Sequence, residues 1–233
     1  MLIELFGQRW FEKGSLSIYY TFATLDQEEV RAVLELPPEG AENMQLRACV
    51  ETPDGKTVAK GTVDIGEPEE VSYIRKIPLE SSPLEELRIL AKTNLVKDLP
   101  PLEDLVLTQE QVDRELETLT DPINWYKGSS PWGPSILNPS LMYHAMMMDV
   151  SGDRIGQAVG FFGATELRNV NGPIKAGVPY RKTGRIVCVG ASPKTEFIWI
   201  DSELYEKDSG KLVADMRHMN RLMKASSPLY QEA

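Results

Sequence analysis

Short runs of alternating apolar and polar residues dominate the chain up to residue 67, and they predict β-strands. These runs are rich in β-branched and aromatic residues, as strands are. Strands are expected at residues 15–22, 29–36, 45–51 and 56–65, with residues 8–11 leading into the first of them. Pro53-Asp54-Gly55 lies between the last two runs and is typical of a hairpin turn. This part of the chain therefore predicts a meander of long antiparallel strands.

A second set of strand-like runs covers residues 158–162, 164–167, 180–189, 196–205 and 212–223. Its last hairpin resembles that of the first set: Asp208-Ser209-Gly210-Lys211-Leu212-Val213-Ala214 corresponds to Asp54-Gly55-Lys56-Thr57-Val58-Ala59. Upstream, Lys13-Gly14 and Ala176-Gly177 each precede a long strand. Two matches in the same order favour a duplicated structural unit.

The most continuous apolar helix pattern begins at Asn138. Asn is a preferred N-cap residue, and Pro139 suits the first helical position. The residues that follow are apolar except for Tyr143 and His144. A helix that is apolar nearly all round lies inside a fold, so residues 138–149 predict a buried central helix. A Gly-, Pro- and Ser-rich loop leads into this helix and could line a site.

The region between the two strand sets reads as a connector. It contains helical spacing at residues 83–91 and a break at Pro100. Thr108 and Gln111 then form a capping-box pattern, which predicts the start of another helix. The chain divides into an N-terminal repeat, a connector and a C-terminal repeat, expected at residues 1–70, 71–104 and 105–233.

Charge and composition restrict the partners. The net charge of −10 argues against nucleic acid, because phosphate binding needs a concentrated basic surface. No apolar stretch is long enough to span a membrane, and the N-terminus lacks the features of a signal peptide. We therefore expect a soluble, cytoplasmic protein with no membrane partner. The sequence also lacks a Gly-rich phosphate loop, a metal-ligand cluster and Ser-His-Asp spacing, so no cofactor and no metal are expected.

Several motifs follow one another in a recognisable order. They are Thr108-Gln109-Glu110, Asp121-Pro122-Ile123-Asn124-Trp125-Tyr126, Pro131-Trp132-Gly133, Ile136-Leu137-Asn138-Pro139 and Asn171-Gly172-Pro173-Ile174-Lys175-Ala176-Gly177. Their order resembles that of the MaoC-like hydratase/dehydratase family. The resemblance implies an α+β double hotdog fold, in which a long antiparallel sheet wraps around a central buried helix. Because the first repeat shows no comparable helix pattern, its helix is expected to be reduced or absent. The resemblance also implies a homodimer.

In that family an aspartate and a histidine act on water and on the α-proton of a thioester. Backbone N–H groups at the helix N-terminus hold the carbonyl oxygen. Asp121 lies at the position of the aspartate, but Tyr126 stands where the histidine would be, and Asn138 replaces a histidine at the helix start. Histidine is poised near neutral pH, whereas tyrosine, with a pKa of about 10, is a poor base. The resemblance implies a lyase, a hydratase or dehydratase, that takes an apolar CoA or carrier-protein thioester and uses Asp121 as acid/base.

Each catalytic candidate also has a simpler structural interpretation. Asp121 precedes a proline and could be a turn or cap residue, and Tyr126 could serve in packing or in a hydrogen bond to substrate. His144 is either a core histidine or the displaced general acid or base. His218 lies in the last strand on the face of Met216, and it could meet the helix.

The binding candidates surround the start of the predicted helix. Gly133, Ser135 and Asn138 are expected to form the oxyanion and substrate site, because free N–H groups and the positive end of a helix dipole polarise a carbonyl. The alternative for this segment is a plain helix cap. Trp125 and Trp132 are expected to line the same cavity.

Other functions remain open at the level of sequence. The missing histidine also fits an isomerase, cyclase or dehydratase of secondary metabolism, a thioesterase, or a non-catalytic subunit that pairs with an active hotdog protein. A basic cluster near the C-terminus, Arg217, Arg221 and Lys224, could meet a CoA phosphate or form a solvated strand face.

Overall fold

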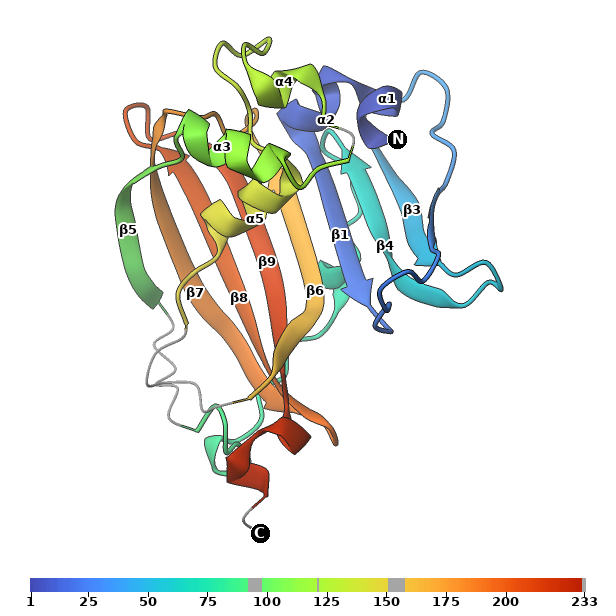
Figure 1. Cartoon of the computed structure of the whole chain (residues 1–233), viewed down its shortest axis with the longest axis vertical. Coiled ribbons are helices and arrows are strands. Elements are labelled where there is room, and N and C mark those ends of the chain that lie inside the picture. Colours follow the sequence, from blue (N-terminus) through green and yellow to red (C-terminus); the bar gives the residue numbers. More distant parts are fainter. Residues whose placement is uncertain (92–97, 121, 151–157, 232–233) are drawn as a thin grey trace.

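A computed structural model describes residues 1–91, 98–120, 122–150 and 158–231, and its strands form one antiparallel sheet (Figure 1). The strand order is β2-β3-β4-β1-β6-β9-β8-β7-β5. The strands are β1 (Gly14–Tyr20), β2 (Arg31–Leu34), β3 (Met44–Glu51), β4 (Thr57–Ile65), β5 (Asp98–Val106), β6 (Gly160–Asn169), β7 (Pro179–Ala191), β8 (Thr195–Glu206) and β9 (Leu212–Met223).

Two repeats meet at one seam in this sheet. Outward from the seam, the first repeat runs β1, β4, β3, β2 and the second runs β6, β9, β8, β7. At the seam, Leu16 of β1 pairs with Leu167 of β6, and Ile18 pairs with Thr165. The matching order on the two sides confirms the duplicated unit that the sequence predicts.

The two predicted hairpin turns occupy equivalent places in the repeats. Gly55 turns β3 into β4 with φ at 86°, and Gly210 turns β8 into β9 with φ at 65°. Each glycine N–H donates to a carbonyl at 2.9 Å, that of Thr52 or Glu206. Glycine adopts these positive φ values without the steric cost that a Cβ would impose.

Helix α5 (Pro139–Met146) lies across the face of the second repeat (Figure 1). Its core side consists of Leu141, Met142, Ala145 and Met146, all buried. Burial of an aliphatic side chain of this size stabilises the fold by about 1.5–3 kcal/mol. Tyr143 is half-buried and His144 is exposed, so one side of the helix faces solvent, although the pattern predicts burial nearly all round. The helix also ends early, because Met147 is extended and its carbonyl accepts Nζ of buried Lys182 at 2.6 Å.

The capping box ahead of α3 (Gln109–Leu116) is confirmed. The N–H of Thr108 donates to Oε1 of Gln111 at 2.8 Å, and the N–H of Gln111 donates to Oγ1 of Thr108 at 3.3 Å. These two bonds satisfy donors that a helix start would otherwise leave free. Helix α4 (Asn124–Lys127) follows and leads into the loop before α5.

Two short helices precede β1, namely α1 (Leu2–Phe6) and α2 (Gln8–Lys13). Residues 8–11, which the sequence places in the strand region as a lead-in to the first strand, are therefore helical. Adjacent aromatic residues fit a strand or a buried helix corner equally well, and here Trp10 and Phe11 turn into the core. The helical part of the N-terminal repeat is thus reduced to these two pieces.

The helical spacing at residues 83–91 does not produce an α-helix. After one 3₁₀ turn, η2 (Leu84–Glu86), the N–H groups of Arg88, Ile89 and Leu90 donate to the carboxylate of Glu196 at 2.7, 3.1 and 2.8 Å. Glu196 is fully buried in β8, so this distant acceptor replaces the bonds that a helix would make.

The connector also contributes the edge strand β5, where the sequence predicts a break. Proline has no N–H to donate and is tolerated at an edge. Pro100 and Pro101 lie in β5, and the pairing with β7 shifts register between Leu99 and Leu105.

Residues 71–82 of the connector pass over the sheet face opposite α5, which we call the outer face. The short 3₁₀ helix η1 (Ile74–Lys76) is anchored there, because the N–H of Ile74 donates to Oγ of buried Ser17 at 3.0 Å. Arg75 forms ion pairs with Glu166 and Asp215 beside it. Among the helices of the described ranges, none is long and apolar enough to cross a membrane.

Candidate functional site at the start of helix α5

A buried asparagine caps the N-terminus of α5. Asn138 is 1% exposed, and its side-chain oxygen accepts the N–H of Leu141 at 3.0 Å, as the sequence predicts for an N-cap. Its Nδ2 group has no hydrogen-bond partner in the described part of the chain. A buried donor without an acceptor costs about 1–3 kcal/mol. A ligand oxygen at this position would remove that cost.

The loop before the helix is fixed by three backbone hydrogen bonds. The N–H of Ile136 donates to the carbonyl of Trp125 at 3.0 Å, and that of Leu137 donates to Ile174 at 2.9 Å. The carbonyl of Ser135 accepts the N–H of Ala176 at 2.9 Å. The helix entry is therefore held against both α4 and the turn before β7, which gives Asn138 a rigid support.

An apolar cavity of about 260 Å³ lies beside the helix entry. Its walls come from α1, α2, the two seam strands and the start of α5, and its apolar lining matches that of ligand sites in general. Asn169 contributes a polar edge, but its Nδ2 already donates to the carbonyl of Trp10 at 3.2 Å. The lining residues are Met1, Leu2, Ile3, Trp10, Phe11, Leu16, Tyr126, Leu137, Pro139, Met142, Leu167, Asn169 and Ile174.

Tyr126 stands in the wall of this cavity and is 4% exposed. Burial raises its pKa to about 12, so the phenol keeps its proton at neutral pH and acts as a donor, not as a base. Phe11 packs edge-on against Tyr126, Trp125 and Trp132, with ring centroids 6.3, 5.6 and 5.7 Å apart. The two tryptophans do not line the cavity themselves; they support it from behind.

Two residues of the entry loop have their polar groups occupied. Gly133 is exposed, has φ at 96°, and donates its N–H to the carbonyl of Ser130 at 3.0 Å in a tight turn. The hydroxyl of Ser135 donates to Oε1 of Gln109 at 2.5 Å. Of the three expected binding residues, Asn138 alone has an unpartnered buried side-chain donor among the described residues.

His144, another catalytic candidate, is not among the residues that line the cavity. His144 is exposed and lies six residues beyond the cap, roughly 9 Å along the helix axis at 1.5 Å per residue. Its ring centroid is 5.4 Å from that of Tyr143. Asp121 lies outside the described residues. Of the candidates, Tyr126 lines the cavity, and Asn138 lies between two lining residues, Leu137 and Pro139.

His218 forms a second buried polar feature, and it meets the helix as its position in the last strand predicts. It is fully buried on the α5 side of β9, with Nδ1 at 3.0 Å from Oγ1 of Thr165 and its ring 5.2 Å from Tyr143 of α5. Within the described ranges, Nε2 has no partner. Burial lowers the pKa of His218 to about 4, so it is neutral at neutral pH. Strand alternation places it on the correct face, but its neutrality depends on packing that the sequence does not reveal.

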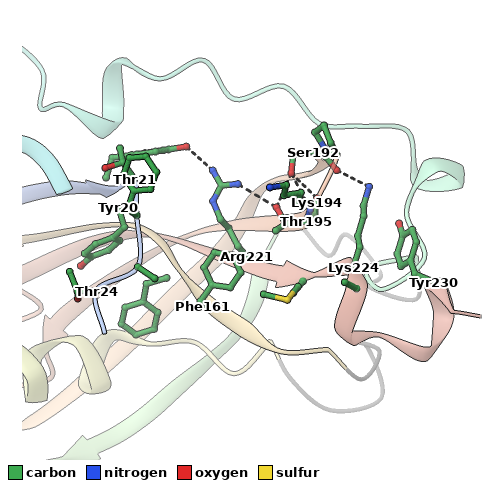
Figure 2. A pocket seen from close by; sticks show the side chains of 17 residues that line it. Tyr20, Thr21, Thr24, Phe161, Ser192, Lys194, Thr195, Arg221, Lys224 and Tyr230 are labelled. Carbon is green, nitrogen blue, oxygen red and sulfur yellow. Dashed lines mark hydrogen bonds between the residues drawn. The ribbon is translucent and has the colours of Figure 1, made fainter. Parts of the chain in front are cut away.

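A larger groove, of about 1440 Å³, lies at the other end of the seam, where β1 ends and β6 begins (Figure 2). The structure divides the basic cluster near the C-terminus. Arg217 is paired with Asp201 at 2.7 and 2.8 Å, whereas Arg221 and Lys224 line the groove.

Comparison with known proteins gives a likeness in fold. No protein-family model and no curated protein sequence matches the chain. Among solved structures, the chain is similar to a putative MaoC domain protein dehydratase from Chloroflexus aurantiacus, at 11% identity over 93% of this chain and 76% of that chain, with a TM-score of 0.50. The fold is a double hotdog.

Two further structures are also similar to this double hotdog chain. The 12:0-ACP thioesterase from Umbellularia californica is 14% identical over 91% of this chain and 72% of that chain, with a TM-score of 0.49. A chain of the ChsH1-ChsH2 complex from Mycobacterium tuberculosis is 16% identical over 62% of this chain and 94% of that chain, with a TM-score of 0.45. In the fold described above, α5 is the helix of the complete repeat, and α1 and α2 are the remainder in the other.

Proposed function

We propose that this double hotdog protein is an enzyme that acts on an apolar acyl thioester at the start of α5. The observation that carries the proposal is the unpartnered Nδ2 of Asn138, buried at a helix N-terminus next to an apolar cavity. The cavity would take the acyl chain, and the amide N–H would donate to the thioester carbonyl oxygen.

The electrostatics of the helix entry support this arrangement. The N-terminus of a helix carries roughly half a positive charge, which favours negative charge on a carbonyl oxygen in a transition state. Tyr126, protonated because its pKa is about 12, would supply or orient a further hydrogen bond. Both groups are buried and supported, so they need little reorganisation when charge develops.

We propose addition or removal of water as the reaction, with Asp121 as the acid/base. In the dehydration direction, the Asp121 carboxylate removes the α-proton and the electron pair moves toward the carbonyl oxygen held by Asn138. The β-carbon–oxygen bond then breaks, and the same proton leaves with the hydroxyl as water. The hydration direction reverses these steps.

A thioesterase is the second candidate. The observation that favours it is Tyr126 itself, which stands at the position of the family's histidine and stays protonated. A single carboxylate that activates water against the same carbonyl would then hydrolyse the thioester.

A mass-spectrometric assay with crotonyl-CoA, longer enoyl-CoAs and saturated acyl-CoAs separates these reactions. The first proposal expects a mass gain of one water on enoyl-CoAs and loss of that activity in Asp121→Asn. Release of free CoA thiol from saturated substrates supports the thioesterase instead. No turnover of any thioester, together with a stable complex with another hotdog protein, would contradict both proposals and favour a non-catalytic subunit.

The proposed enzyme is a homodimer. Light scattering on the purified protein tests this, and a monomer mass would contradict it.

A further inference from the structure

We propose that the groove at the far end of the seam binds a phosphorylated nucleotide, either free or as the nucleotide end of coenzyme A. Only the coenzyme A case rests on the proposed function. The groove holds about 1440 Å³, larger than the roughly 300–1,000 Å³ typical of small-molecule pockets, so a nucleotide has room to enter.

The charge of the groove is opposite to that of the protein. The chain has 35 acidic and 25 basic residues and a net charge of −10. The described residues that line the groove nevertheless include Lys194, Arg221 and Lys224 and no aspartate or glutamate. None of these three takes part in an ion pair among the described residues. Arg217, four residues before Arg221 in β9, is by contrast paired with Asp201. A local excess of unpaired cations in an acidic protein points to an anionic ligand.

Arg221 is pre-organised for that ligand (Figure 2). Its guanidinium donates to the hydroxyl oxygen of Tyr19 at 2.6 Å and to Oγ1 of Thr195 at 3.3 Å. A guanidinium has five N–H donors, so three remain for a ligand. A planar guanidinium held in one orientation suits the paired oxygens of a phosphate.

Lys224 extends the basic wall from the end of β9. Its Nζ donates to the carbonyl of Ser192 in the β7–β8 hairpin at 2.8 Å, which leaves two of its three N–H donors. Lys194, in the same hairpin, is exposed. Phosphate oxygens in the groove would therefore meet donors from two separate elements.

Aromatic rings form the other part of the lining, and they favour a ligand that carries a flat ring. Tyr20, Phe161 and Phe162 line the side toward β1 and β6, and each is more than a third exposed. Tyr230 is the last residue of η4 (Pro228–Tyr230), and the Nζ of Lys224 lies 5.3 Å from its ring centroid. Exposed aromatic rings next to cations bind nucleobases by stacking while the cations hold the phosphate. Inorganic phosphate alone would leave these rings unused.

Calorimetric titration of the whole protein with ADP, coenzyme A, adenosine and inorganic phosphate tests the inference. ADP and coenzyme A are expected to bind, with affinities that fall as salt rises, and adenosine is expected to bind at least about tenfold more weakly. Equal affinities for ADP and coenzyme A identify the nucleotide itself as the ligand. If coenzyme A binds more tightly than ADP, and the groove variants lose both this binding and acyl-CoA turnover, the ligand of the groove is the nucleotide end of coenzyme A.

Arg221→Gln is expected to weaken ADP binding at least about tenfold, because it removes a charged donor. Since this change also removes contacts to Tyr19 and Thr195, the exposed Lys194→Gln provides a second variant with little structural consequence, and a weaker but measurable loss is expected. Lys211→Gln carries the same charge change at the opposite end of β9 and should bind ADP as the wild type does.

The inference is overturned if neither ADP nor coenzyme A binds at millimolar concentration, or if both groove variants bind them as tightly as the wild type. Binding is measured without turnover, so the outcome is independent of the proposed reaction. ADP binding that persists in an inactive Asp121→Asn protein would support the groove even if no thioester is converted.

Discussion

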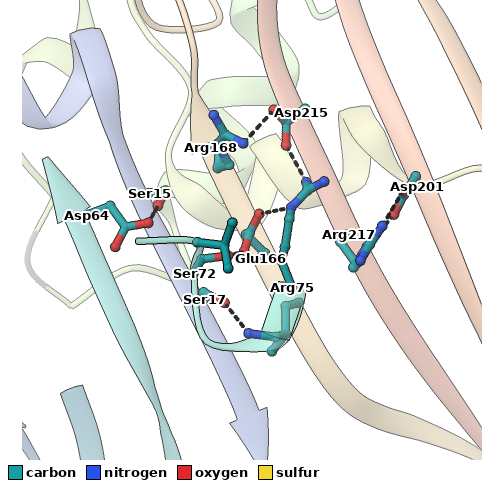
Figure 3. A network of polar contacts seen from close by, with 12 residues as sticks. Ser15, Ser17, Asp64, Ser72, Arg75, Glu166, Arg168, Asp201, Asp215 and Arg217 are labelled. Carbon is teal, nitrogen blue, oxygen red and sulfur yellow. Dashed lines mark hydrogen bonds and ion pairs between the residues drawn. The ribbon is translucent and has the colours of Figure 1, made fainter. Parts of the chain in front are cut away.

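Arg75 and Glu166 form an ion pair across the outer face of the sheet, with Nε and Oε1 2.5 Å apart (Figure 3). Glu166 lies in seam strand β6 and its side chain is fully buried, while Arg75 belongs to the connector. Ser72 donates a hydrogen bond to the same carboxylate, and Arg75 also reaches Asp215 of β9 at 2.7 Å. One connector residue therefore satisfies charges in two strands of the second repeat.

Arg75→Met should destabilise the fold by roughly 3 kcal/mol, because it leaves the Glu166 carboxylate buried without its cation. Urea unfolding measures the change as a lower midpoint at constant slope. Lys13→Met removes the exposed Lys13–Glu67 ion pair and serves as a control with no resolvable change. Adding Glu166→Gln to Arg75→Met should recover part of the loss. A midpoint equal to that of the wild type in Arg75→Met would contradict this role.

The stability of the fold should depend on pH through buried His218. The pKa of buried His218 is about 4 in the folded state, against about 6.5 unfolded, so between these values only the unfolded chain binds the proton. The free energy of unfolding is thus highest above about pH 6.5 and falls as pH drops through this window. The expected loss from His218 is about 2 kcal/mol between about pH 7 and about pH 5.

Urea unfolding at these two pH values tests the effect. His218→Gln should lose stability less steeply on acidification than the wild type, because no imidazole remains to be protonated on unfolding. His144→Gln, at an exposed position, should follow the wild-type pH dependence. The same pH dependence in all three proteins would show that His218 does not carry the effect.

Asn138→Ser separates capping from carbonyl binding. Serine is also a good N-cap, so unfolding should change by less than about 1 kcal/mol. The variant loses the Nδ2 donor, and turnover of the thioester should fall by about a hundredfold. Asn124→Ser makes the same chemical change at an exposed position and should keep both properties. Unchanged turnover in Asn138→Ser would exclude Nδ2 from the reaction.

Tyr126→Phe tests whether the phenol acts as a donor. With a pKa of about 12, Tyr126 stays protonated up to about pH 10, so it should produce no limb in the pH profile of kcat/KM below that value. Removal of the hydroxyl should lower kcat/KM by about tenfold or more across the whole range, since the packing against Phe11 is kept. A kcat/KM that rises with pH through a pKa below about 10 in the wild type, and that loses this rise in Tyr126→Phe, would instead identify Tyr126 as a base.

Features with a local cause could be predicted from the sequence. The turns at Gly55 and Gly210, the capping box at Thr108 and the cap at Asn138 each depend on residues within four positions of one another. Their order along the chain was enough to predict the duplicated sheet and the helix of the second repeat.

Features with a distant cause could not be predicted. The backbone near Ile89 departs from a helix because Glu196, 107 positions away, accepts its N–H. The cavity at the helix entry depends on Leu2 and Trp10, which come from the far end of the chain. The exposure of His144 and the burial of His218 follow from how α5 is rotated on the sheet. A one-dimensional pattern specifies which residues are apolar, but it does not specify which side of a partly apolar helix meets the core.

The pairing of β1 with β6 at the seam joins two repeats of one polypeptide, so the contact between the repeats is intramolecular. If each repeat were a separate chain, their pairing would depend on protein concentration, and identical halves would have to keep identical helices. Because both halves belong to one polypeptide, the N-terminal half can contribute a paired strand while its helix is reduced to α1 and α2. The short helices then line part of a cavity beside α5 of the other half. Covalent linkage has thus released this protein from the symmetry of a two-site dimer.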